Sequence, residues 1–228
     1  MTEEKKNNVE APVEDLFSTK DIDTTIKGLE KASETWYEQA AEQTHAVSGD
    51  TYVKLDCGVL TVDQLNYFLN SMPFELTFAD DNNQFLYYNN MMPAEEMLAG
   101  RNPGQVGNAI AYCHPERARK GAAAVVNLLR TGKQKKFRLA VPGNGPDKCV
   151  LHDYIAMHDE DGRFRGVNEQ IYDLMPAIQW YLKHTGQKLV DDPNVTADTV
   201  TGPSQHKEAE KKEAPQVADA TSGASHQE

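Results

Sequence analysis

The sequence predicts an α+β fold in which a five-stranded antiparallel sheet carries helices on one face, flanked by an N-terminal helix and disordered tails. Three observations indicate this fold class. Apolar and polar residues alternate at 74–79, and after a turn a run of apolar and aromatic residues at 85–88 forms the second strand of a hairpin. A segment with helical spacing, 115–132, separates this hairpin from three further strands. Sequential hairpins make a sheet antiparallel, and the intervening helices then cover one face.

The charge distribution places the packed part of the chain in its middle. The 228 residues include 35 acidic and 23 basic side chains, for a net charge of -12. Residues 60–181 hold 14 acidic and 12 basic side chains, so most of the excess charge belongs to the flanks. A field of this sign repels nucleic acid and anionic membranes, so we expect neither as a partner.

The terminal segments and the cysteines indicate the cellular location. We expect disorder at 1–17 and at 186–228, where no aromatic residue follows Val190. No apolar stretch approaches the length of roughly 18 residues that a membrane span needs, and the charged N-terminus does not resemble a secretion signal. Three cysteines do not suggest a disulfide framework. We therefore expect a cytoplasmic protein.

The N-terminal elements are predicted from spacing and capping. Residues 18–47 form an amphipathic flanking helix whose thin apolar stripe must dock on the central block or on a second copy of the chain. Thr61 and Gln64 form a capping box that starts the next helix, and Pro73 ends it.

The later elements follow in order. Asp80 to Asn83 form the turn of the first hairpin. Residues 91–112 form short helical turns broken by prolines and glycines, and the helix that begins at Pro115 stops at Gly132. Three strands and a short helix complete the prediction, at 137–141, 149–157, 164–174 and 176–185.

This order of elements resembles a PAS domain over residues 55–175. Three runs carry the resemblance. Leu76 to Asn82 followed by Tyr87-Tyr88-Asn89 is similar to the opening hairpin of that family, and Asp159 to Gly166 is similar to its last turn. Tyr112-Cys113-His114-Pro115 resembles a bacterial subset that often occurs beside hemerythrin-like domains.

The resemblance implies a sensory domain with a pocket between the sheet and the helices, able to hold haem, flavin, a small metabolite or nothing. It also implies dimerisation through flanking helices. Our candidate cofactor-binding residues are Phe78, Tyr88, Met97, Cys113, His114, Asn168 and Gln170.

Cys113 and His114 are the sharpest chemical feature. A thiolate or an imidazole beside a pocket can ligate haem iron, and His114 is the candidate metal ligand, with Met97 among the possible opposite ligands. The alternative is that His114 caps the helix while Cys113 is buried as a small hydrophobe. The family's flavin photoadduct uses a cysteine in a different run, so we expect no flavin photochemistry here.

The strand at 149–157 raises the question of which face is buried. Cys149, Leu151 and Ile155 are more apolar than His152 and His158, so we expect the histidines to point outward. Asp153 then lies on the apolar face and needs a partner or a bulge. Asn168 and Gln170 either face the pocket and bind a polar ligand or form an ordinary solvent face.

We expect a stand-alone sensory module that binds a small ligand and relays its state to a signalling protein through flanking helices or a homodimer. No phosphate loop, nucleophile elbow or zinc-hydrolase motif is present in the sequence, so we expect no enzyme. The alternatives are a haem sensor with His114 as axial ligand, and a ligand-free scaffold for protein interactions.

Overall fold

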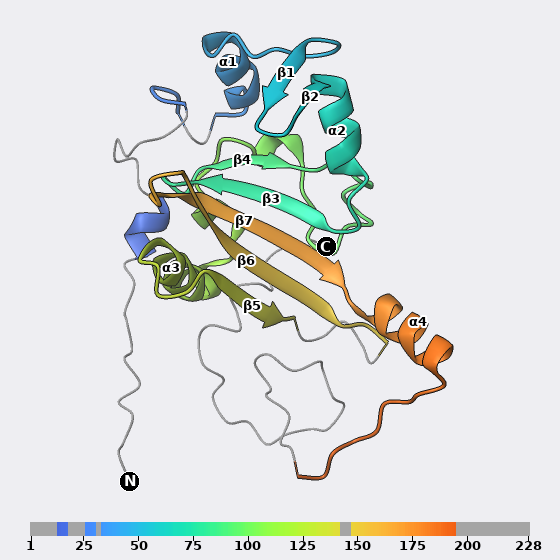
Figure 1. The fold of residues 1–228 in the computed structure, drawn as a ribbon. Helices are drawn as coiled ribbons and strands as arrows, with labels where there is room; N and C mark the ends of the chain where they lie inside the picture. Colours follow the sequence, from blue (N-terminus) through green and yellow to red (C-terminus); the bar gives the residue numbers. More distant parts are fainter. Residues whose placement is uncertain (1–12, 18–25, 31–32, 142–146, 195–228) are drawn as a thin grey trace.

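The computed structural model describes residues 13–17, 26–30, 33–141 and 147–194. At its centre lies a five-stranded sheet in the order β4-β3-β7-β6-β5, in which every neighbouring pair is antiparallel (Figure 1). Its strands are β3 (Glu75–Asp80), β4 (Phe85–Tyr88), β5 (Lys136–Ala140), β6 (Val150–His158) and β7 (Phe164–Asp173). The predicted α+β class, with a five-stranded antiparallel sheet, is confirmed.

Helix α3 (Glu116–Arg130) packs against β5, β6 and β7 on one face of this sheet. Its apolar residues recur at helical spacing and are buried, which fixes the side that it turns to the sheet. Gly132 follows the helix with φ of 68°, the left-handed conformation that the predicted stop requires. Two short 3-10 helices precede α3, namely η2 (Pro103–Gln105) and η3 (Ile110–Cys113).

The segment before the sheet forms a small unit beyond the β4 edge (Figure 1). It contains α1 (Trp36–Gln43), a hairpin of β1 (Tyr52–Leu55) and β2 (Gly58–Thr61), and α2 (Val62–Asn70). The predicted capping box starts α2: the Gln64 backbone N–H donates to Thr61 Oγ1 at 3.1 Å, and the Thr61 N–H donates to Gln64 Oε1 at 3.0 Å. The β1–β2 hairpin was not predicted.

The predicted N-terminal flanking helix is present, but in the described part of 18–47 it is confined to α1. Only α1 is helical there, whereas 26–30 and 33–35 are bends and turns. Gly28 has φ of 80°, which an α-helix does not allow. Burial of Trp36 and Ala40 against Phe85 and Val106 instead holds the chain in place. Residues 18–25 and 31–32 lie outside the described residues.

The tail predicted to be disordered over 1–17 contains an ordered piece. Val13–Phe17 form the 3-10 helix η1, and its Leu16 is completely buried. The prediction failed here because a single leucine, inserted between elements far away in the sequence, leaves no local periodicity to detect. Residues 1–12 lie outside the described part.

Helix α4 (Met175–Thr185) continues from β7 and extends past the end of the sheet (Figure 1). It begins one residue before the predicted 176–185. Gly186 follows it with φ of 68°. In the predicted disordered tail, 186–194 are exposed without helix or strand, and 195–228 lie outside the described residues. Among the described residues, no helix is both apolar enough and long enough to cross a bilayer.

Strand pairing decides which residues share a face of the sheet. Residues directly opposite each other in antiparallel strands point to the same side. Thr77 lies opposite Glu169, and Glu169 opposite Tyr154, so these three share the face that α3 covers. Phe78 lies opposite Asn168, and Asn168 opposite Ile155, so these three share the other face.

This register overturns the predicted orientation of β6. His152 and Tyr154 point toward α3, not outward, while Leu151, Asp153 and Ile155 occupy the opposite face. For His152 the prediction was wrong because it followed hydrophobicity along one strand, whereas His152 is 3% exposed and paired with a carboxylate of β7. His158, at the end of β6, is exposed as predicted.

Asp153 finds its partners on the outer face without a bulge. Arg138 donates to both carboxylate oxygens at 2.6 and 2.7 Å, Lys136 Nζ lies 2.7 Å from Oδ2, and Tyr172 donates to Oδ2 at 2.9 Å. Burial alone raises the pKa of Asp153, but these hydrogen bonds outweigh it and lower the pKa to about 2. A charged group on this face is thus satisfied by its neighbours on β5 and β7.

Gly166 allows β3 and β7 to approach closely. Its φ is 131°, and a Cβ there would lie 2.1 Å from the Ala79 carbonyl oxygen. We predict that Gly166→Ala lowers the free energy of unfolding by about 3 kcal/mol, measured by urea denaturation. Gly162, in the same hairpin, has φ of 77° and open space around it, so Gly162→Ala is the control, with a loss of about 1 kcal/mol. Equal losses would contradict this assignment.

Candidate functional site

A cavity of about 60 Å³ lies between α3 and the sheet face that α3 covers. Three strands, one helix and the η3 segment all contribute to its wall. The lining residues are Thr77 and Ala79 from β3, Tyr154 from β6, Val167 and Glu169 from β7, Ala122, Val125, Val126 and Leu129 from α3, and Ile110 and His114 from η3 and its C-terminal cap.

The sequence builds this wall from two simple periods. On α3 the lining residues follow the spacing i, i+3, i+4 and i+7, which is one face of a helix. On β3 and β7 they alternate, as residues on one face of a strand do. The α3 residues at the wall are small or branched, so the helix approaches the sheet without filling the space between them.

One end of the cavity is polar, and Glu169 is its centre. Arg101 Nη2 lies 3.0 Å from Glu169 Oε2, and His152 Nδ1 lies 3.2 Å from Glu169 Oε1. The Tyr154 hydroxyl lies 3.4 Å from His152 Nδ1. Arg101 is 8% exposed and Glu169 13% exposed, so this is a buried ion pair.

The ion pair keeps a carboxylate charged beside an apolar space. Burial by itself disfavours the ionised form of Glu169, but the hydrogen bond with His152 and the charge of Arg101 outweigh it, so the pKa of Glu169 lies well below its usual range. Burial raises the pKa of Tyr154 well above 10, so its hydroxyl stays protonated. These polar groups mostly pair with one another, so the surface of the cavity beside them stays largely apolar.

His114 also lines the cavity, within electrostatic reach of Glu169. Its Nδ1 lies 2.7 Å from the Ile110 carbonyl oxygen, so Nδ1 carries the proton. Burial lowers the pKa of His114 below 6.5, opposed by that hydrogen bond. The ring is thus neutral at pH 7, and its Nε2 is the acceptor.

Glu75 anchors the loop that supplies Arg101. Its two carboxylate oxygens accept hydrogen bonds from the backbone N–H groups of Leu98 and Ala99. Arg101 follows two residues later, with its Nε 3.4 Å from Thr77 Oγ1 and its guanidinium 5.8 Å from the Phe85 ring centroid. The loop therefore brings the Arg101 guanidinium to the sheet face on which β7 carries Glu169, close enough for the two charges to pair.

The structure brings one of the seven candidate residues to the cavity wall, namely His114. Phe78, Asn168 and Gln170 lie on the opposite face of the sheet. Tyr88 packs beside Phe85, with ring centroids 6.1 Å apart. The last two are Met97, which is half-buried in the loop before Arg101, and Cys113, which packs against a cluster containing Trp36 and Val106.

Sequence reasoning missed Arg101, Tyr154 and Glu169. The signal for Glu169 was present: it lies two residues from both Val167 and Ile171 and therefore shares their strand face, and a carboxylate on an apolar strand face needs a partner. Nothing local indicated Arg101, because its partner is 68 residues away.

The residues do not fit a haem in this arrangement. A neutral His114 is a suitable ligand type, but the cavity of about 60 Å³ is far smaller than the roughly 300 Å³ or more of pockets for drug-sized ligands. Within the described ranges, no three His, Cys, Asp or Glu side chains are grouped to hold a metal ion.

Comparison with known proteins shows what the central part of the chain is similar to. Residues 65–175, about half of the chain, match the family model described as a PAS domain. This part of the chain is PAS-like in sequence as well as in fold. A search of curated proteins gave no match.

Several solved structures are similar to this chain. A crystal structure of a C-terminal domain from Streptococcus mutans is 35% identical, with a TM-score of 0.54, over 57% of this chain and 98% of that one. A PAS domain from Colwellia psychrerythraea is 13% identical, with a TM-score of 0.38, over 50% and 98%. A sensory box sensor histidine kinase from Vibrio cholerae is 18% identical, with a TM-score of 0.35, over 48% and 88%.

Removing one member of the buried pair tests the polar end of the PAS-type domain. We predict that Arg101→Met lowers the free energy of unfolding by about 3–5 kcal/mol, because it leaves Glu169 buried without its counter-charge. Arg163→Met is the matched control, since the ion pair of Arg163 with Asp161 is exposed, and it changes stability by less than about 1 kcal/mol. Urea denaturation at pH 7 measures the free energy of unfolding of both variants. Similar losses in Arg101→Met and Arg163→Met would show that the ion pair of Arg101 is not buried.

Proposed function

We propose that this PAS-type domain is a sensory module that binds a small ligand in the cavity and passes its state to a signalling protein. The observation that carries the proposal is the cavity itself, an apolar space between α3 and the sheet with His114, Tyr154 and Glu169 at its wall. Protein cores are normally filled to crystal-like density, so a lined hollow of this kind calls for an explanation. A ligand site supplies one.

The size and lining of the cavity define the ligand. A space of about 10–15 Å³ holds one water molecule, so about 60 Å³ holds a molecule of only a few heavy atoms. Seven of the eleven lining residues are Ala, Val, Ile or Leu, so most of that molecule must be apolar. Its one polar group would accept a hydrogen bond from Tyr154 or donate one to Glu169 or His114 Nε2.

In this proposal, flanking segments or a homodimer pass the ligand-bound state of the domain to the signalling protein. Helix α4 leaves the end of β7 and exposes Trp180 and Tyr181, at 63% and 50%, which gives it an apolar surface for a second chain or a partner. Three free cysteines support the cytoplasmic location that the sequence predicts. The proposal assigns the domain no catalytic step. Membership in the Cys-His-Pro subset stays a prediction.

Xenon tests the cavity, because it enters apolar cavities without needing a specific hydrogen bond. We predict that dissolved xenon shifts the methyl NMR signals of Val125 and Leu129 in the full chain, and that Val125→Phe, which fills the cavity, abolishes the response. Lys120→Met, on the exposed side of α3, is the control and keeps it. Native mass spectrometry of the purified chain then identifies a co-purified ligand and the oligomeric state.

Absence of any xenon response, together with no co-purified molecule, would overturn the ligand-binding proposal. The domain would then act as a ligand-free interaction scaffold. A Soret band in the purified protein that is lost in His114→Ala would instead favour the haem sensor and require the cavity to enlarge.

A further inference from the structure

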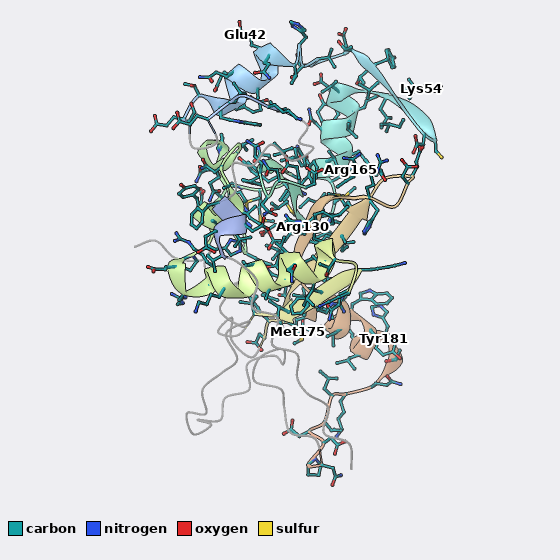
Figure 2. The ribbon with its side chains drawn as sticks, turned by 90° about the vertical axis from the view of Figure 1, so that its left-hand side faces the viewer. Glu42, Lys54, Arg130, Arg165, Met175 and Tyr181 are labelled. Carbon is teal, nitrogen blue, oxygen red and sulfur yellow. The ribbon has the colours of Figure 1, made fainter. Side chains whose placement is uncertain are left out.

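The N-terminal segment η1 is seated on the wall of the cavity. Leu16 is fully buried in a cluster with Ala111 of η3 and Ala122, Ala123 and Val126 of α3. Two of these residues, Ala122 and Val126, also line the cavity. Figure 2 shows η1, in violet-blue, lying beside α3, with Arg130 next to it. The same two side chains thus separate Leu16 from any occupant of the cavity.

Contacts on both sides of Leu16 fix the segment in one register. Before it, the Asp15 carboxylate pairs with Arg130, and Asn83 Nδ2 donates to the Asp15 carbonyl oxygen at 3.0 Å. After it, the Phe17 ring meets Tyr112 edge-on at 5.4 Å and lies 5.0 Å from the Arg119 guanidinium.

The groove for this segment is made by elements that also form the cavity. Arg130 is held in place by Asn83 Oδ1 at 2.8 Å, from the β3–β4 turn, and its guanidinium lies over the Phe164 ring of β7 at 5.6 Å. Groove and cavity both require the present spacing between α3, η3 and the sheet. Since Ala122 and Val126 belong to both, the two sites share a wall through which binding at one can be coupled to binding at the other.

Seating of the segment is finely balanced. A five-residue 3-10 helix has no stability of its own. The entropy lost in ordering it is of the same order as what its buried leucine, partly exposed ion pair, Asn83 hydrogen bond and Phe17 ring contacts return. A small change at Ala122 or Val126 is therefore enough to shift its population. A segment whose docked and undocked states are close in free energy can report whether the cavity is occupied.

We propose that η1 is a docked reporter segment, an acidic-Leu-Phe motif whose seating on α3 and η3 is coupled positively to occupancy of the cavity. This inference rests on the proposed function of the cavity. Occupancy holds η1 in its groove, and loss of the ligand releases the segment.

Reciprocal measurements on the full chain test the coupling, with xenon as the probe. Leu16→Ala and Asp15→Asn each weaken xenon binding, measured from the Val125 methyl signal, by about fivefold or more. In the unaltered chain, xenon slows amide hydrogen exchange of Leu16 and Phe17 by a similar factor. Glu14→Ala is the control, because Glu14 lies in the same 3-10 helix but is exposed, and it changes neither quantity.

Two outcomes separate this inference from the proposed function. If xenon binds equally well to the unaltered chain, to Leu16→Ala and to Asp15→Asn, the segment and the cavity are independent and the inference is overturned, while the ligand site stands. If xenon does not bind the unaltered chain, the proposed function fails first. Should Leu16→Ala not fold, Asp15→Asn alone decides, since it removes a partly exposed charge and leaves the packing intact.

Discussion

The buried ion pair of Arg101 and Glu169 is the constraint around which this domain is arranged. A charged carboxylate can stay inside only with an opposite charge and satisfied hydrogen bonds, and here a loop, β6 and β7 must all be in place to supply them. Glu75 anchors that loop and so helps to hold Arg101 beside Glu169. The polar groups around this pair mostly bind one another. The cavity next to them is therefore lined mainly by apolar side chains.

The sequence predicted those features that local periodicity encodes. The hairpin at β3 and β4, the capping box at Thr61 and the stop at Gly132 were all visible in short windows of residues. The face that β6 buries was not, because His152 is satisfied by Glu169, on a neighbouring strand 17 residues away. Local hydrophobicity favours the wrong face whenever a buried polar group has its partner outside the strand that is being considered.

The residues of the candidate site also divide into those that a local motif reveals and those that depend on distant partners. His114 was found through its motif, whereas the four lining residues of α3 look like ordinary core residues in the sequence. Leu16 was missed for a related reason: it lies in a polar, acidic segment, and its burial depends on Ala111 and Val126, over 90 residues away in sequence. Long-range pairing of single residues thus creates both the cavity and its link to the N-terminal segment.

A double-mutant cycle on Arg101 and Glu169 tests most directly whether this pair organises the site. The free energies of unfolding of Arg101→Met, Glu169→Leu and the double variant are compared with that of the unaltered chain. The account predicts that the double variant is more stable than Arg101→Met by about 2 kcal/mol or more, because no uncompensated charge remains inside. Losses that simply add would show that the two charges do not depend on each other, and would contradict the account.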